Sequence, residues 1–171
     1  MNNNKSKFQL IKYDIAILLI CVIVVAIDTI TKLITDGETL DGIPGFISIF
    51  STHNFGGAWS IFSNATLVLT ITSIALLVVI LFFNAVYKDK SGLYTFAIGL
   101  VCGGAVGNII DRVFLGYVRD FIKLEFMKFP VFNIADCAIT IGTILLCVYF
   151  VIFTKKDKKQ EKQNLEDKTD N

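Results

Sequence analysis

The chain has 171 residues, of which 54% are hydrophobic and 18% charged, and its mean hydropathy is +0.65. Soluble domains carry about 25% charged residues, so this composition argues against an ordinary soluble domain. The formal net charge of +1 argues by itself neither for nor against an anionic partner, and we expect no nucleic acid partner. A single histidine and four cysteines without paired Cys/His spacing give no zinc signature.

Four stretches are long and apolar enough to cross a membrane, which takes roughly 20 apolar residues. They lie at approximately 15–34, 65–87, 91–112 and 136–154. The first stretch lacks a small-residue cleavage site, so we expect a retained span and not a signal peptide. The sequence therefore predicts a membrane all-α fold. Residues 1–154 are expected to form one domain, a four-transmembrane-helix bundle with small extracytoplasmic β-rich segments.

Basic residues in the connecting segments predict the orientation of the spans. Eleven lysines precede the first span, separate the second from the third, or follow the fourth: Lys5, Lys7, Lys12, Lys88, Lys90, Lys155, Lys156, Lys158, Lys159, Lys162 and Lys168. The other side receives five basic residues: Lys32, Arg112, Arg119, Lys123 and Lys128. Both termini are therefore expected in the cytoplasm. The segment 155–171 is charged and has no aromatic residue, which favours a disordered tail.

Two extracytoplasmic segments, at about 35–64 and 113–132, have the composition of short strands. Residues 117–126 alternate in polarity, and Asp120 is the only charge on the apolar face of this predicted strand. A carboxylate there must be paired, protonated or involved in chemistry, because burying an unpaired charge is costly. No partner for Asp120 is evident nearby in the sequence.

The third span carries glycines at the four-residue spacing that allows helices to approach closely: Gly99, Gly103 and Gly107. Beside them, Gly104, Asn108 and Asp111 share a second face. Polar groups at membrane depth face protein or water and are functional candidates.

Four spans with cytoplasmic termini place the following acids and amides on one side: Asp28, Asn54, Asn108, Asp111, Asp120, Asn133 and Asp136. Several have structural interpretations. Asn133 and Asp136 are spaced as a helix cap, Asp28 and Lys32 as an i, i+4 pair, and Asn54 as a turn residue. A further ion pair could join Asp111 to Arg112.

Two aspartates that share one proton can also hydrolyse a peptide bond, and Asp120 and Asp136 are the best candidates for such a pair. A small ion- or proton-coupled transporter is the alternative function, since intramembrane carboxylates also build ion pathways. A purely structural scaffold is the third possibility, although it would not require Asp120.

Five motifs in order resemble those of lipoprotein signal peptidase (signal peptidase II), a bacterial membrane aspartyl peptidase family. They are 28–32 (DTITK), 52–60 (THNFGGAWS), 103–112 (GGAVGNIIDR), 118–122 (VRDFI) and 132–136 (FNIAD). Thr29 and Trp59 depart from the glutamine and phenylalanine that are common in this family.

The resemblance implies that Asp120 and Asp136 form the catalytic dyad. It further implies a group of substrate-binding and supporting residues: Asp28, Lys32, Asn54, Gly56, Asn108, Asp111, Arg112, Asn133 and Ala135. The substrate would be a prolipoprotein that already carries diacylglycerol, cut just before the lipidated cysteine. The implied enzyme lies in the bacterial cell membrane among membrane lipids, works without metal or cofactor, and is expected to be a monomer.

Overall fold

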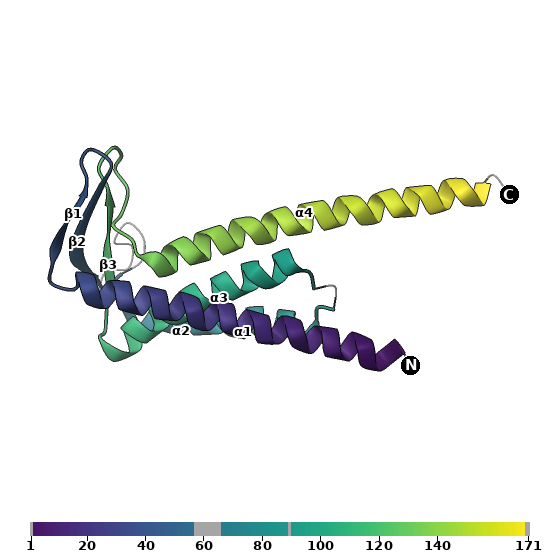
Figure 1. Ribbon diagram of the computed structural model, residues 1–171, viewed down its shortest axis with the longest axis horizontal. Helices are drawn as coiled ribbons and strands as arrows, with labels where there is room; N and C mark the ends of the chain where they lie inside the picture. Colours follow the sequence, from purple (N-terminus) through teal and green to yellow (C-terminus); the bar gives the residue numbers. More distant parts are fainter. Residues whose placement is uncertain (1, 57–65, 89, 170–171) are drawn as a thin grey trace.

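The computed structural model describes residues 2–56, 66–88 and 90–169. Four helices and three strands follow one another in the order α1 (Asn2–Thr35), β1 (Thr39–Ile43), β2 (Ile47–Asn54), α2 (Thr66–Val86), α3 (Gly92–Phe114), β3 (Val118–Leu124) and α4 (Ile134–Thr169). The helices run side by side, and the strands gather at the end of the bundle that lies away from both termini (Figure 1). We call this the sheet end.

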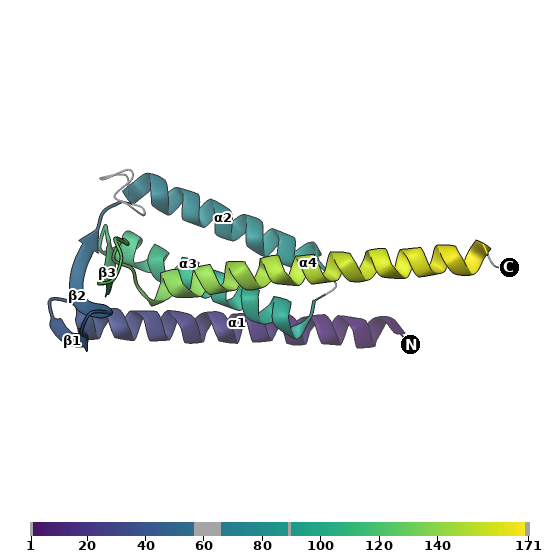
Figure 2. The ribbon, with the colours of Figure 1, turned by 90° about the horizontal axis from the view of Figure 1, so that it is seen from above.

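Each helix contains a segment long and apolar enough to span a membrane: Phe8–Thr35, Thr66–Val86, Gly92–Phe114 and Ile134–Phe153. The predicted membrane bundle of four helices is thus confirmed. In the most apolar part of α3, 61% of the residues are buried, whereas in that of α2 the share is 0%. The central helix is therefore α3, and α2 is peripheral. In Figure 2, α4 passes in front of α3, with α2 on one side and α1 on the other.

Glycine allows the central helix to approach its neighbours closely. A Cβ atom at Gly104 would lie 2.3 Å from the carbonyl oxygen of Ala135 on α4, and one at Gly103 would lie 2.6 Å from Cβ of Val24 on α1. Neither distance is compatible with a side chain. The predicted close approach at the small residues of the third span is therefore present on both sides of α3.

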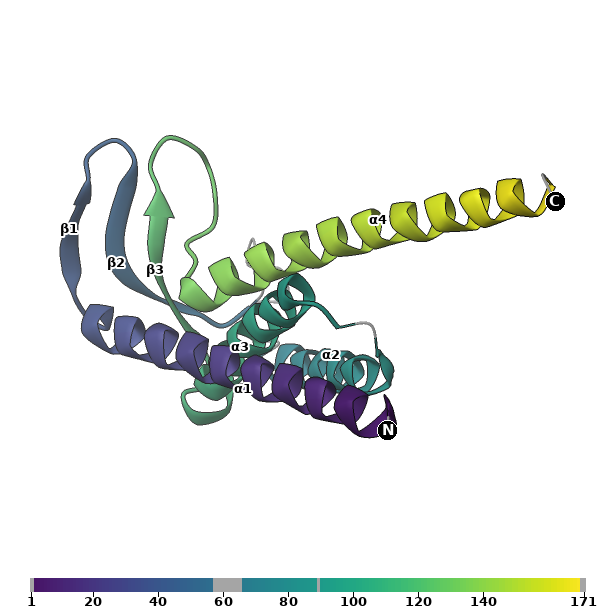
Figure 3. The ribbon, with the colours of Figure 1, turned by 45° about the vertical axis from the view of Figure 1, so that its right-hand side comes forward.

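The three strands form an antiparallel sheet in the order β1-β2-β3. The strands cross the end of the bundle instead of continuing along the helices (Figure 3). In the register of β2 and β3, Thr52 is opposite Asp120 and Asn54 is opposite Val118. The segment after β3 returns to the sheet, because Ile122 and Phe132 exchange backbone hydrogen bonds of 2.8 and 3.0 Å just before α4 begins. These pairings bring Asn54, Asp120 and the start of α4 together.

Two expectations from the sequence require correction. The predicted strand at 117–126 is shorter, at Val118–Leu124, and Arg119 and Phe121 on the face opposite Asp120 are buried as well. The ends of α1 and α3 contact this strand and cover it. The segment 155–169, expected to be disordered, continues α4 as a helix to Thr169. Lysine, glutamate and glutamine are good helix formers, and the span before them supplies the first turns.

Candidate active site

Asp120 lies on β3 with only 2% of its surface exposed, and two amides hold its carboxylate. Asn54 Nδ2 donates to Oδ2 at 2.8 Å, and Asn133 Nδ2 donates to Oδ1 at 2.6 Å. Burial, and then the nearby charge of Asp136, raise the pKa of Asp120 to about 7. The partners that were not evident in the sequence thus come from β2 and from the residue before α4.

The side chain of Asn54 is fixed by its own turn. Its Oδ1 accepts a hydrogen bond of 3.0 Å from the backbone N–H of Gly56, which leaves Nδ2 to face Asp120. The turn interpretation of Asn54 is therefore correct, and the turn also orients the amide towards the carboxylate. Gly56 acts on the site through this hydrogen bond.

Asp136 is held at the start of α4 by a reciprocal cap. The backbone N–H of Asp136 donates to Asn133 Oδ1 at 2.9 Å, and the backbone N–H of Asn133 donates to Asp136 Oδ2 at 3.2 Å. Asn108 Nδ2 on α3 donates to the other oxygen of Asp136 at 2.8 Å. The capping interpretation is thus confirmed. It is compatible with a chemical role, because the cap fixes the position of the carboxylate.

Asn133 joins three elements at the centre of the site. It is fully buried, and its Nδ2 group lies within hydrogen-bonding distance of Asp120 Oδ1, Asn108 Oδ1 (3.1 Å) and the carbonyl oxygen of Arg119 (3.3 Å). A side-chain amide has two N–H donors, so these acceptors compete for them. Asn133 therefore links α3, β3 and α4 by a single side chain.

A charged cluster lies behind the amides. Lys32 Nζ is 2.7 Å from Asp28 Oδ2 and 3.3 Å from Asp111 Oδ2, and it donates to Asn108 Oδ1 at 3.2 Å. Asp28 Oδ1 accepts a hydrogen bond of 2.9 Å from the backbone N–H of Ala135. The side chain of Lys32 is completely buried, so its charge has to be balanced by these carboxylates. The predicted pair of Asp28 and Lys32 is present.

The pair of Asp111 with Arg112 is not formed, and Arg119, which the prediction of site residues omitted, takes that place. Arg119 Nη2 is 2.8 Å from Asp111 Oδ1, and the backbone N–H of Arg119 donates to Asp111 Oδ2 at 3.0 Å. Hydrogen bonds to Asp111 raise the pKa of Arg119. A single sequence gives no signal for this contact, because it joins the end of α3 to β3 through the fold.

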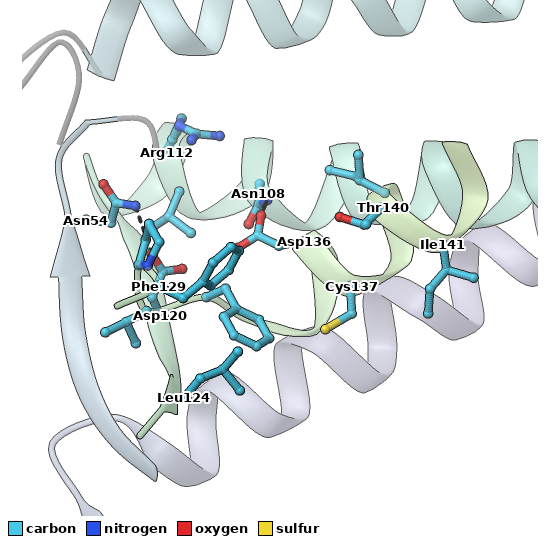
Figure 4. A pocket seen from close by; sticks show the side chains of 15 residues that line it. Asn54, Asn108, Arg112, Asp120, Leu124, Phe129, Asp136, Cys137, Thr140 and Ile141 are labelled. Atoms are coloured by element: carbon cyan, nitrogen blue, oxygen red, sulfur yellow. Dashed lines mark hydrogen bonds between the residues drawn. The ribbon is translucent and has the colours of Figure 1, made fainter. Parts of the chain in front are cut away.

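A cavity of about 560 Å³ has a polar end and apolar walls (Figure 4). Its polar end is lined by Asn54, Asn108, Arg112, Asp120 and Asp136, and its apolar part by Val118, Leu124, Phe129, Pro130, Val131, Phe132, Cys137, Ile139 and Ile141. Within the described part of the chain Arg112 forms no salt bridge, so its guanidinium is available to the cavity. An extended apolar group that ends in a polar linkage would fit this shape.

Of the predicted site residues, five line this cavity, and Gly56 bonds to one of these five, Asn54. Asp28, Lys32, Asp111, Asn133 and Ala135 are behind it, and they hold the residues that line it. Among residues 2–56, 66–88 and 90–169, no three His, Cys, Asp or Glu side chains are grouped so that they could hold a metal ion. The cavity therefore offers two carboxylates, three amide or guanidinium groups and an apolar surface.

A family model described as Signal peptidase (SPase) II matches residues 20–152, which include the entire cavity. The chain belongs to the signal peptidase II family. It is 38% identical to the lipoprotein signal peptidase of Lactobacillus johnsonii, over 82% of this chain and 94% of that protein. It is 36% identical to that of Enterococcus faecalis, over 82% of this chain and 91% of that protein.

A solved structure of a bacterial membrane enzyme has the same fold, with a TM-score of 0.76 and 37% identity over 82% of this chain and 90% of that one. The signal peptidase II fold of this chain is therefore a four-span bundle with a three-stranded sheet at one end. Four of the five motifs that resemble this family contribute residues to the cavity wall, and the first motif, 28–32, lies behind it. Residues 57–60 of the second motif, including Trp59, lie outside the described residues.

Proposed function

We propose that this chain is an aspartic endopeptidase that removes the signal peptide from diacylglyceryl-modified prolipoproteins, cutting just before the lipidated cysteine. The supporting observation is that Asp120 and Asp136 line the polar end of a cavity whose remaining wall is apolar. A peptide bond next to a diacylglyceryl group has the same division into a polar centre and an apolar arm. Membership of the signal peptidase II family supports this substrate class and does not support the transporter alternative.

The reaction that we propose uses a water molecule between the two aspartates. Ionised Asp136 takes a proton from the water, whose oxygen attacks the scissile carbonyl carbon, while protonated Asp120 gives its proton to the carbonyl oxygen. Asp136 then passes its proton to the leaving nitrogen as the C–N bond breaks, and Asp120 recovers its proton from the collapsing hydroxyl. The assignment of the resting proton to Asp120 follows from its raised pKa.

Asn54 and Asn108 position the two carboxylates, and we assign Arg112 to the substrate backbone. A guanidinium without a salt bridge can donate hydrogen bonds to peptide carbonyl oxygens. Both aspartates come from the same chain, so the proposed site is complete in a monomer. The lysine distribution supports cytoplasmic termini, and we propose that the sheet end, with its site, lies at the opposite membrane surface.

The proposal is tested with purified protein in lipid vesicles that contain a diacylglyceryl-modified prolipoprotein. Asp120→Asn and Asp136→Asn should each abolish the shortened product while the helical circular dichroism spectrum is unchanged. Asp41→Asn, which alters an exposed aspartate of β1, is the matched control and should cleave at the parent rate. Cleavage at the parent rate by either of the first two variants would refute the dyad assignment.

A further inference from the structure

Two chain segments lie at the ends of the strands and are held together by hydrogen bonds: the turn Ile43–Phe46 and the loop Glu125–Phe129. We call them the joined tip. Glu125 makes the connection, because its carboxylate accepts hydrogen bonds from Gly45 N (2.8 Å) and from Ser48 Oγ. The backbone N–H of Glu125 also donates to the carbonyl oxygen of Phe46 at 3.0 Å. The two segments therefore move together.

The surface of the joined tip is apolar. Five large side chains are between 45% and 61% exposed: Ile43, Phe46, Phe126, Met127 and Phe129. The rings of Phe46 and Phe126 lie 6.0 Å apart, so side chains from both segments form one patch. Lys128 is the basic residue within it. An exposed apolar patch of this kind marks a surface that is covered by a partner or by a membrane.

The position of the joined tip identifies what covers it. The strands cross the end of the bundle, and their tips project sideways past the start of α4 (Figures 1 and 3). The loop after β3 then bends back towards α4 on the side of the helices. On α4, Ile141, Ile144 and Val148 are exposed within the segment Ile134–Phe153, which is apolar enough to span a membrane. Phe129 of the joined tip and Ile141 of α4 both line the cavity, so apolar side chains connect the tip with this span.

We propose that the joined tip inserts into the boundary between headgroups and acyl chains of the membrane leaflet at the sheet end. Apolar side chains such as phenylalanine are stabilised when they are buried at this boundary, and a lysine next to them can reach the lipid phosphates. Leu124 and Phe129 also line the cavity, so insertion would seat the cavity mouth on the leaflet. The proposal goes beyond the peptidase function and does not depend on which residues are catalytic.

The test places a tryptophan on the joined tip, in Phe46→Trp and separately in Phe126→Trp. Each variant is reconstituted in vesicles of phosphatidylcholine and phosphatidylglycerol, with the phosphatidylcholine acyl chains brominated either near the headgroup or near the chain end. The emission of the parent chain, which contains Trp59, is subtracted. Thr39→Trp, on the exposed far end of β1, is the matched control.

Both tip tryptophans should lose more than half of their emission with bromine near the headgroup, less with bromine near the chain end, and the control should lose little. This pattern should persist when the protein is diluted tenfold in lipid. Quenching no stronger than that of Thr39→Trp would overturn the proposal. So would quenching that appears or disappears on dilution, because a second copy of the chain would then cover the tip. If either variant fails to fold, Met127→Trp replaces it with the same expectation.

Discussion

At Asp120, burial and the neighbouring Asp136 act on the pKa in the same direction. Both raise it, whereas the hydrogen bonds from Asn54 and Asn133 lower it without reversing the shift. An acid with a pKa of about 7 holds its proton below neutral pH. In the proposed dyad, a proton held by Asp120 makes Asp120 the acid. This state is the one that the proposed hydrolysis needs.

The pH dependence of cleavage follows from the sign of this shift. As the pH rises through about 7, Asp120 loses the proton that it must donate, so kcat/KM should fall on the alkaline side. Initial rates in vesicles, measured from about pH 5 to about pH 9, give the profile. Glu125→Gln serves as the control, because this carboxylate lies in the joined tip and should leave the alkaline limb in place.

The same profile identifies the titrating group. Removing the amide that donates to Asp120 Oδ2, in Asn54→Ala, takes away a hydrogen bond that favours the carboxylate. The alkaline limb should therefore move to higher pH in this variant. An unchanged limb would mean that a group other than Asp120 controls it.

Arg119 is a positioning residue that acts on the dyad through Asp111 and through its own backbone. Arg119→Ala should lower kcat by about tenfold or more, since small displacements of reacting groups reduce rates strongly. KM should change little, because Arg119 does not line the cavity. Arg119→Lys should restore part of kcat, as it keeps the charge beside Asp111. The split between kcat and KM is measured by steady-state kinetics.

The matched control for Arg119 is Lys123→Ala, which removes a basic side chain from the exposed part of the same strand. It should leave kcat at the parent value. Loss of Arg119 also removes the guanidinium that lies 2.8 Å from Asp111 Oδ1, which should lower the free energy of unfolding by about 3 kcal/mol. Equal kcat values for Arg119→Ala and the control would contradict the positioning role.

Among the elements, α3 controls how closely α4 can approach, and therefore where Asp136 lies. Gly104→Ala introduces a Cβ atom 2.3 Å from the Ala135 carbonyl oxygen and 2.7 Å from Ile139 Cγ1. Overpacking of this kind costs about 1–3 kcal/mol, and moving α4 outward displaces Asp136 as well. We expect lower thermal stability in detergent together with reduced cleavage.

Gly92→Ala is the control for this substitution, since nothing lies within 4 Å of a Cβ atom at Gly92 in the first turn of the same helix. It should melt and cleave like the parent chain. If Gly104→Ala does the same, the contact between α3 and α4 does not determine the position of Asp136.

Patterns within short stretches of sequence predict the elements well. The four spans follow from length and polarity, the pair of Asp28 with Lys32 from helical spacing, and the cap of Asn133 and Asp136 from the three-residue separation. Contacts between distant segments are not encoded locally. The pairing of Asp111 with Arg119, and the convergence of Asn108, Asn133 and Lys32, depend on how α1, α3 and β3 pack. These connections could therefore not be predicted from the sequence alone.

At the scale of the whole molecule, the candidate site and the two termini lie at opposite ends of the helices. The lysine distribution predicts that both termini face the cytoplasm. In bacterial cells, a fluorescent protein fused after Asn171 should fluoresce, and alkaline phosphatase fused there should be inactive. The same reporters inserted at Gly37, in the exposed turn before β1, should give the reverse result. Active phosphatase at the C-terminus would place the site on the cytoplasmic side.

The hydrogen bond from Ala135 N to Asp28 Oδ1 joins residues 107 positions apart in the first and last spans. Asn108 of the third span bonds both to Lys32 of the first span and to Asp136 of the last. The chain therefore cannot assemble its two aspartates until the fourth helix has been made and has packed against the others. During synthesis, when earlier spans enter the membrane first, the nascent protein has no hydrolytic centre. Cleavage by the proposed dyad is thus coupled to completion of the fold.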